Sequence, residues 1–216
     1  MHRTHGFDIV SVTYLPELNS KGVFARHRET GCEVYHMLND DEENLFAYSF
    51  MTPPTDSTGV AHILEHSVLC GSKNYPLKDP FLILAKQSVK TFLNAMTFPD
   101  KTVYPASSMV EADYFNLMAV YGDSVFFPLL DRWIFRQEGH RVELDESGNA
   151  TVQGIVFNEM RGNYSSFDTI AGDWTIRSIL EGTPYTHDSG GDPAVIPELT
   201  YEQFINFHRT YYHPVN

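Results

Sequence analysis

Short runs rich in β-branched and aromatic residues open the chain, each bounded by turn residues. They predict strands at residues 7–14, 21–27, 32–37 and 45–51. Pro16 and two polar turn stretches separate the four runs. We therefore expect these strands to form one antiparallel meander.

Helical periodicity takes over after the Pro-rich loop at residues 52–57. Ser57 or Thr58 can cap a first helix, and Gly71 can end it. Further helices are expected at residues 81–87, 109–126, 131–139, 152–164 and 200–211, and further strands at 91–96, 102–107 and 141–144. No repeat or linker divides the chain, so we expect one α+β domain over residues 1–216, a mainly antiparallel sheet with helices packed on one face.

The helix at residues 109–126 carries an apolar stripe. Tyr114, Phe115, Met118 and Tyr121 recur at helical spacing, as they would in a helix lying on a sheet. Core packing explains this stripe better than a platform for a ligand.

Composition favours a globular enzyme over a nucleic-acid-binding or membrane protein. The formal net charge of −13 provides no basic footprint for nucleic acid; it would attract cationic peptides, or serve solubility alone. Cys32 and Cys70 make no disulfide framework, which fits a reducing compartment. No apolar run reaches the roughly 18 residues of a membrane span, and the first seven residues lack the features of a signal or transit peptide. We expect no membrane partner, and a cytoplasmic location in a bacterium or an organellar matrix in a eukaryote.

The clearest chemistry lies in the pentad His-Ile-Leu-Glu-His at residues 62–66. On an α-helix, His62 and His66 project from one face about one turn apart and can bind the same ion. Glu65 lies near that face, where its carboxylate can accept a proton from metal-bound water. The order H-x-x-E-H is the inverse of the commoner zincin motif and is typical of a class of metallopeptidases.

The residues around the pentad favour a buried helix over a solvated surface turn. Ile63, Leu64, Val68 and Leu69 surround the polar trio. Ionisable groups in such a helix are costly unless they are paired or bind a metal. The flanks therefore strengthen the metal-site hypothesis.

A catalytic zinc needs a third protein ligand and leaves a fourth position to water. Cys70 continues the four-residue series but drifts about 40° around the helix at each step, and a lone cysteine is more often a buried apolar residue. Glu138 and Glu159 each follow apolar residues on what looks like the inward face of a helix. Periodicity does not choose between these two glutamates.

Two weaker patterns carry less chemistry. Ser67 or Cys70 beside His66 could suggest a nucleophile and a base, but they share one helix and no oxyanion-hole signature accompanies them. The Ser-Gly-Gly-Asp stretch at residues 189–192 lacks the pattern of a phosphate-binding loop. We expect that stretch to form a tight turn.

The segment from Gly59 to Ser72, GVAHILEHSVLCGS, resembles the pitrilysin-type (M16) metallopeptidases, specifically their presequence protease and falcilysin branch. Further matching stretches follow in the family's order along nearly the whole chain. They are YP and KDPF at residues 75–81, TFLNAMT at 91–97, QEG at 137–139, FNEMRG at 157–162, SGGDP at 189–193 and YHP at 212–214.

The resemblance implies a zinc metalloendopeptidase. In the family, the third zinc ligand is the glutamate of the Asn-Glu-Met segment, here Glu159, and an edge strand beside the Asn-Ala pair, here Asn94 and Ala95, holds the substrate backbone. Family members are several times longer and enclose unfolded peptides between two halves, with an Arg and a Tyr of the second half completing the site. We therefore expect residues 1–216 to be the catalytic N-terminal domain of a longer chain, with its C-terminal half as partner.

The expected reaction is peptide hydrolysis, with zinc held by His62, His66 and Glu159 and with Glu65 as general base. The substrates would be presequence-like or other short unfolded peptides, and the isolated domain would be weakly active or inactive. An inactive metal-binding fragment or a non-catalytic subunit of the same family is the alternative. A structural zinc domain would need four Cys or His ligands, and the chain lacks the cysteines.

Overall fold

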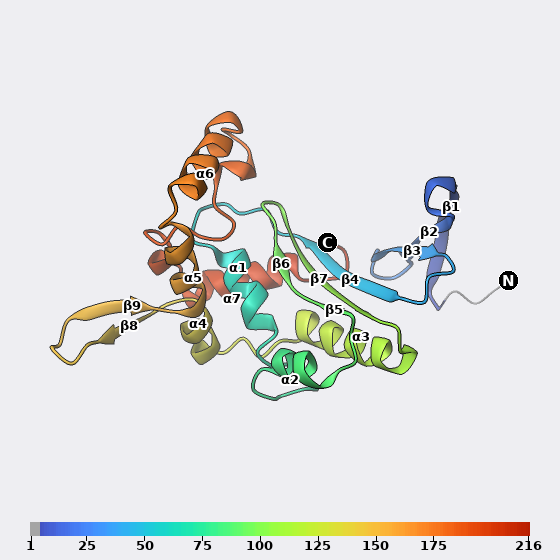
Figure 1. Ribbon diagram of the computed structural model, residues 1–216, viewed down its shortest axis with the longest axis horizontal. Helices are drawn as coiled ribbons and strands as arrows, with labels where there is room; N and C mark the ends of the chain where they lie inside the picture. Colours follow the sequence, from blue (N-terminus) through green and yellow to red (C-terminus); the bar gives the residue numbers. More distant parts are fainter. Residues whose placement is uncertain (1–4) are drawn as a thin grey trace.

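A computed structural model describes residues 5–216 (Figure 1). Residues 1–4, part of the stretch considered above for a targeting peptide, lie outside the described residues. The strands are β1 (Phe7–Leu15), β2 (Ser20–His27), β3 (Glu33–Leu38), β4 (Asn44–Met51), β5 (Phe92–Leu93), β6 (Met96–Thr97), β7 (Lys101–Ser108), β8 (Arg141–Leu144) and β9 (Ala150–Gln153). The helices are α1 (Val60–Val68), α2 (Pro80–Gln87), α3 (Glu111–Phe126), α4 (Arg132–Glu138), α5 (Ile155–Asn163), α6 (Phe167–Ile179) and α7 (Tyr201–Tyr211), with short 3₁₀ turns at Pro16–Leu18, Pro184–Thr186 and Ile196–Glu198.

The central sheet has the order β4-β7-β5, with β6 also pairing with β7, and all of its pairs are antiparallel. The predicted four-strand meander is therefore wrong at its last strand. Strands β1 to β3 form a separate three-stranded sheet, which lies to one side of the molecule in Figure 1. β4 leaves them because Phe46 and Phe50 are buried in the core, where the strand pairs with β7.

Helices α1 and α3 pack against the central sheet, and α7 packs against α1. α3 contacts β4 and β7, while α1 contacts β6, α4 and α7. Ile63, Leu64 and Val68 of α1 have no exposed surface, and each such side chain stabilises the fold by about 1.5–3 kcal/mol. The predicted α+β fold of antiparallel sheets and packed helices is confirmed, and α1 lies at the centre of its core.

The apolar stripe of α3 packs as predicted, with one exception. Tyr121 is buried and meets Phe46 edge to face at 5.7 Å between ring centroids, and Tyr114 and Met118 also border the core. Phe115, in contrast, is 55% exposed, so its assignment to the core is wrong.

Two helix boundaries differ from the predictions. α1 starts after Gly59, a left-handed residue, without the predicted side-chain cap, because the Thr58 hydroxyl donates to Asp56 instead; it ends at Val68 rather than near Gly71. α5 begins at Ile155 rather than near Val152, because residues 150–153 pair with β8 in a hairpin.

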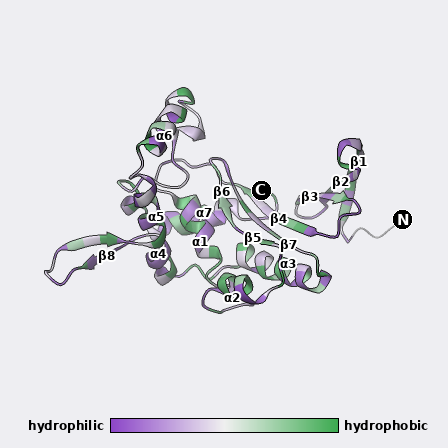
Figure 2. Ribbon diagram, in the orientation of Figure 1, coloured by the Kyte–Doolittle hydropathy of each residue, from purple (hydrophilic) through white to green (hydrophobic). Residues whose placement is uncertain are grey.

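Helix α6 was not predicted from the sequence. Its signals were present, namely the Ser166 side chain that caps it and apolar residues at Phe167, Ile170 and Trp174. None of its residues is buried, and its apolar side chains do not form the continuous stripe of a helix that packs on a core. Figure 2 shows hydrophobic positions on this helix, which projects from the rest of the molecule.

The remaining helices match their predictions within two residues. Asp131 caps α4 by accepting from two backbone N–H groups, and Thr200 and Gln203 form a capping box on α7. Cys32 and Cys70 are both free thiols. None of the helices within residues 5–216 has both the length and the apolar character needed to cross a bilayer.

Candidate metal centre

Helix α1 presents His62 with its ring held in one orientation. The side chain is 11% exposed, and its Nδ1 lies 3.0 Å from the backbone oxygen of Gly190. A carbonyl oxygen only accepts, so Nδ1 carries the proton and donates it to Gly190. The lone pair therefore resides on Nε2, the nitrogen that faces Glu159.

His66, one helical turn later, is oriented by a buried carboxylate. Its Nδ1 lies 3.3 Å from Oε2 of Glu138. The other carboxylate oxygen of Glu138, Oε1, accepts hydrogen bonds from Gln137 Nε2 at 2.8 Å and from the Cys70 thiol at 3.5 Å. Burial lowers the pKa of His66, but the hydrogen bond to Glu138 and the nearby carboxylates outweigh it and raise that pKa. Burial opposes ionisation of Glu138, yet its bonds to His66 and Gln137 lower its pKa, so it stays charged.

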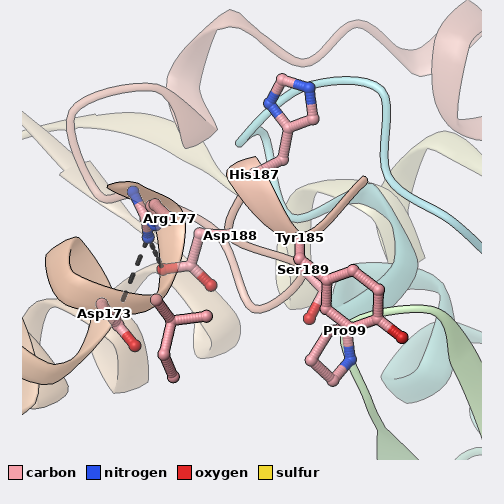
Figure 3. Close-up of a pocket in the computed structure, with 8 residues that line it drawn as sticks. Pro99, Asp173, Arg177, Tyr185, His187, Asp188 and Ser189 are labelled. Atoms are coloured by element: carbon pink, nitrogen blue, oxygen red, sulfur yellow. Dashed lines mark hydrogen bonds and ion pairs between the residues drawn. The ribbon is translucent and has the colours of Figure 1, made fainter. Parts of the chain in front are cut away.

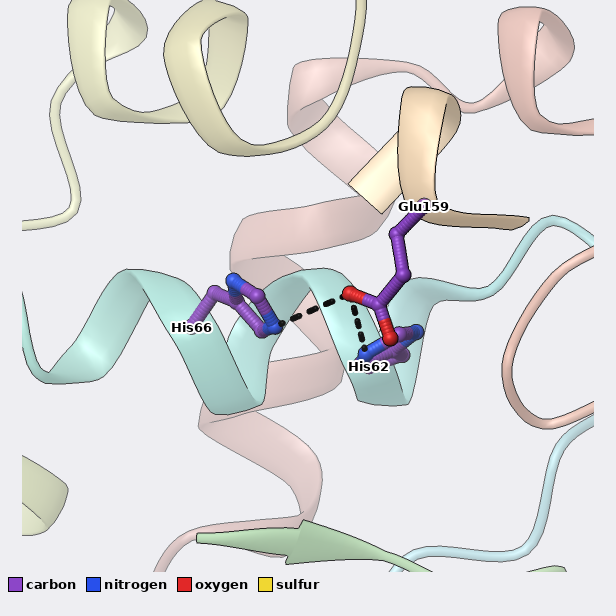
Figure 4. Close-up of side chains that lie close together, drawn as sticks. All are labelled: His62, His66 and Glu159. Atoms are coloured by element: carbon purple, nitrogen blue, oxygen red, sulfur yellow. Dashed lines mark ion pairs between the residues drawn. The ribbon is translucent and has the colours of Figure 1, made fainter. Parts of the chain in front are cut away.

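Glu159 approaches both histidines from the facing helix α5 (Figure 4). Its Oε2 lies 3.7 Å from His62 Nε2 and 3.8 Å from His66 Nε2, and the three ligand atoms lie within 4.8 Å of one another. Ligand atoms around a tetrahedral zinc stand about 3.4 Å apart, as bond lengths of about 2.0–2.1 Å require. The two distances from Glu159 exceed this separation by a few tenths of an ångström, so the carboxylate lies close to the position of a third ligand.

The structure separates the two glutamates that periodicity left open. Glu159 lies with the two Nε2 atoms, whereas Glu138 lies on the opposite side of the His66 ring, bonded to Nδ1. Cys70 points at Glu138 and at the His66 carbonyl, and burial raises the pKa of its thiol, so it remains neutral. Ser67 is buried and donates to the Ile63 carbonyl, which leaves no support for a nucleophile on α1.

Glu65 is buried beside the two histidines and is held by a residue that the sequence analysis assigned no role. Its Oε2 accepts a hydrogen bond of 2.7 Å from the hydroxyl of Thr97, on β6. Thr97 stands 32 residues away in the chain, so no local pattern could have linked the two. The bond fixes the carboxylate at the wall of the cleft.

A cleft of about 550 Å³ brings the predicted site residues together. His62, Glu65, His66 and Glu159 line it together with residues 94–98. Asn94 and Ala95 interrupt the short strands β5 and β6 at the edge of the central sheet. The side-chain oxygen of Asn94 accepts a hydrogen bond from the Ala95 N–H, and the backbone oxygen of Asn94 accepts one from the Tyr121 hydroxyl. These bonds fix the conformation of the chain between β5 and β6.

Comparisons with known proteins agree with this geometry. Residues 51–165 match the protein-family model described as "Insulinase (Peptidase family M16)". "Presequence protease 1, chloroplastic/mitochondrial" of Arabidopsis thaliana is 50% identical over 214 residues, which are 98% of this chain and 20% of that protein. The mitochondrial presequence protease of Mus musculus is 44% identical over 218 residues, 99% of this chain and 21% of that protein.

Two further similarities extend the comparison. An uncharacterised protein of Borreliella burgdorferi is 49% identical over 207 residues, 95% of this chain and 21% of that protein. The crystal structure of pitrilysin has the same fold, with a TM-score of 0.65 at 20% identity over 96% of this chain and 22% of that one. The chain thus spans about a fifth of the length of the relatives it matches.

Proposed function

Because the chain belongs to the insulinase (M16) peptidase family, we propose that it is the catalytic N-terminal domain of a zinc metalloendopeptidase that hydrolyses unfolded peptides. The convergence of His62 Nε2, His66 Nε2 and Glu159 Oε2 from two facing helices carries the proposal. Two imidazoles and one carboxylate are a donor set that zinc accepts at catalytic sites, and three ligands leave a position for water or substrate.

The chain's own residues supply the rest of the chemistry. Bound zinc would lower the pKa of its water and polarise the scissile carbonyl. Glu65, held by Thr97 beside the two histidines, would accept a proton from the attacking water and pass it to the leaving amine. Gly190 and Glu138 hold the imidazoles in the tautomer that directs both Nε2 atoms at Glu159.

The edge of the central sheet is the proposed peptide-binding element. A peptide added as a strand beside residues 92–97 would be held mainly through its backbone, which gives grip with little sequence preference. The net charge of −13 would favour cationic peptides, consistent with relatives named presequence proteases. Since those relatives are about five times longer, we propose that further domains complete the substrate chamber. The proposed location is the cytoplasm of a bacterium or the matrix of an organelle.

Glu65→Gln in the complete protein tests this mechanism. The amide keeps the size of the side chain but cannot act as a base, so peptide cleavage should fall roughly 10²- to 10⁴-fold. Zinc content, measured by mass spectrometry of metals, should stay near one per site. His62→Ala should lose both zinc and activity. An active Glu65→Gln protein would show that the mechanism is wrong.

Asn94→Ala tests the peptide-binding edge. Cleavage should weaken through a higher KM while zinc content is unchanged, because Asn94 lies beside the expected peptide backbone and is not one of the three candidate ligands. Asn39→Ala, an exposed change outside the cleft, is the matched control. Equal loss of zinc in the Asn94 variant would show that this residue supports the fold or the metal centre instead.

The isolated 216-residue chain distinguishes a catalytic domain from a complete enzyme. It should bind zinc and cleave peptides very poorly, because it lacks the further domains that we propose to complete the substrate chamber. Cleavage by the unmodified 216-residue chain at rates comparable to the complete protein would show that no second half is needed.

A further inference from the structure

The turn at residues 188–191 is pressed against the N-terminus of α1 by two glycines. A Cβ on Gly59 would lie 2.7 Å from the Gly190 oxygen, and a Cβ on Gly191 would lie 2.9 Å from the Gly59 Cα. Both glycines also have positive φ angles, which side chains rarely tolerate. This close approach brings the Gly190 carbonyl to the ring of His62.

Hydrogen bonds fasten the same turn to the loop that precedes α1. The backbone N–H of Asp188 donates to the Ser57 hydroxyl at 3.1 Å, and that of Asp192 donates to the Ser57 carbonyl at 2.9 Å. The turn is therefore fixed to the segment that leads into α1. The Ser-Gly-Gly-Asp stretch, which the sequence presents only as a tight turn, contributes the acceptor for a metal ligand.

Asp188 joins this turn to the other half of the site. Its Oδ1 accepts from the N–H groups of Gly190 and Gly191, at 2.9 and 3.3 Å. Its Oδ2 accepts from the Tyr164 hydroxyl at 2.6 Å and from Arg177 Nη2 at 2.8 Å. Tyr164 is the C-terminal cap of α5, the helix that carries Glu159, so one carboxylate connects the supports of both His62 and Glu159.

Arg177 reaches Asp188 from α6, and both side chains are nearly buried, at 14% and 12% exposed. Figure 3 shows the pair beside a cavity of about 160 Å³ lined by Pro99, Tyr185 and His187 among others. Because no residue of α6 is buried, this helix adds little to the core. The main polar link of α6 is thus directed at the turn that orients His62.

We propose that Asp188 is a positioning residue for the metal centre: bonded to Tyr164 and Arg177, it holds the 188–191 turn so that the Gly190 carbonyl keeps His62 in its metal-binding tautomer. The inference rests on the proposed metal role of His62. Loss of a partner that orients a metal-bound histidine typically weakens metal affinity about 10- to 100-fold. Asp188 touches neither the metal nor the substrate and acts only through the turn.

Asp188→Asn in the complete protein tests the proposal. Asn keeps the size but replaces one acceptor oxygen by a donor NH2 group, so it cannot accept from both the turn and the Tyr164 and Arg177 side chains as Asp188 does. Zinc affinity, measured by competition with a chromogenic chelator, should fall about 10- to 100-fold. The visible absorption of the cobalt-substituted protein, which reports ligand geometry, should also change. Unchanged zinc affinity and an unchanged cobalt spectrum would overturn the proposal.

Asp173→Asn is the matched control. Asp173 also lies near Arg177, at 3.9 Å, but no hydrogen bond joins it to the turn. The control should bind zinc as the unmodified protein does. Equal weakening in both variants would show that the charge around Arg177, rather than the bond to the turn, sets the affinity, and would also overturn the proposal.

Tyr164→Phe covers the case in which Asp188→Asn does not fold. It removes one hydrogen bond to Asp188 and leaves the ring in place, so zinc affinity should fall a few-fold while the melting temperature falls by no more than about 4 °C. Unaltered affinity in this variant would contradict the inference. If the unmodified protein binds no zinc, or binds it after His62→Ala, the proposed function itself fails; if both behave as expected and the Asp188 and Tyr164 variants bind normally, only this inference fails.

Discussion

Helices α1 and α5 supply the candidate ligands from two very different settings. Eight of the nine residues of α1 are buried, and both of its histidines have an Nδ1 partner. Only three of the nine residues of α5 are buried, and the side chain of Glu159 is 47% exposed. For the proposed metal site we infer a division of labour, in which the histidines are oriented before a metal binds and the glutamate would then close onto the ion.

The division follows from the chemistry of the two ligand types. An imidazole has to offer one particular nitrogen, so its ring benefits from a fixed partner on the other nitrogen. A carboxylate has two equivalent oxygens on a flexible stem and can adapt to the ion. The burial of α1 would therefore favour zinc binding, and the exposure of Glu159 in the cleft would weaken zinc binding little.

The largest expected effect compares one ligand from each helix. His62→Ala should weaken zinc binding by more than about 100-fold, beyond the range typical for supporting residues. Glu159→Gln should weaken it less, because the amide oxygen on the same flexible arm can still approach the ion. Chelator competition on both variants measures the difference. Stronger loss from Glu159→Gln would break the proposed division of labour.

The second prediction concerns stability without metal. Leu64→Ala, in the fully buried α1, should lower the free energy of unfolding by about 2–5 kcal/mol. Ile155→Ala, at the exposed start of α5, should cost only about 0.5 kcal/mol. Urea unfolding of the metal-free variants gives both values. Similar costs at the two positions would show that α5 is as firmly packed as α1.

The same contrast explains how much the sequence could predict. The two histidines and Glu65 lie within five residues, so helical geometry alone places them on one face. Glu138 and Glu159 both follow apolar residues on helices, and only the packing of those helices around α1 decides which one reaches the Nε2 atoms. The resemblance to known metallopeptidases pointed to Glu159, which periodicity could not do.

Long-range pairing limited the prediction of the fold in the same way. β4 has the pattern of a meander strand, but its partner β7 lies some fifty residues further on, and no local signal names that partner. Thr97 and Gly190 were overlooked as partners of Glu65 and His62 for the same reason. Local elements were largely predictable, whereas the contacts that orient the site were not.

A third prediction tests whether the histidines are set in advance. Glu138→Gln keeps an acceptor for His66 Nδ1 but removes the negative charge that strengthens the bond. Zinc affinity should fall about tenfold, at the lower end of the range for supporting residues. Glu143→Gln, on the exposed hairpin strand β8, is the control and should have no effect. Normal affinity in Glu138→Gln would mean that packing alone orients His66.

The smallest expected effect is on the pH dependence of stability and concerns α7, which packs against α1. His208 of α7 donates to the Val125 carbonyl, and burial lowers its pKa below the usual value of 6.5. As pH falls through about 6.5, His208 takes up a proton in the unfolded chain but stays neutral in the folded state, so the free energy of unfolding falls. His208→Gln should lose less stability than the unmodified chain between pH 8 and pH 5, as measured by urea unfolding. Identical pH profiles would exclude His208 as a source of acid sensitivity.

The two histidines also differ in how a mutation can remove their hydrogen-bond acceptors. The acceptor for His66 is the side chain of Glu138, which a single codon change can delete. The acceptor for His62 is a peptide oxygen at Gly190, which every amino acid possesses. A mutation can move that oxygen away from His62 only by displacing the turn. The support of His62 therefore depends on the backbone conformation, whereas the support of His66 depends on one side chain.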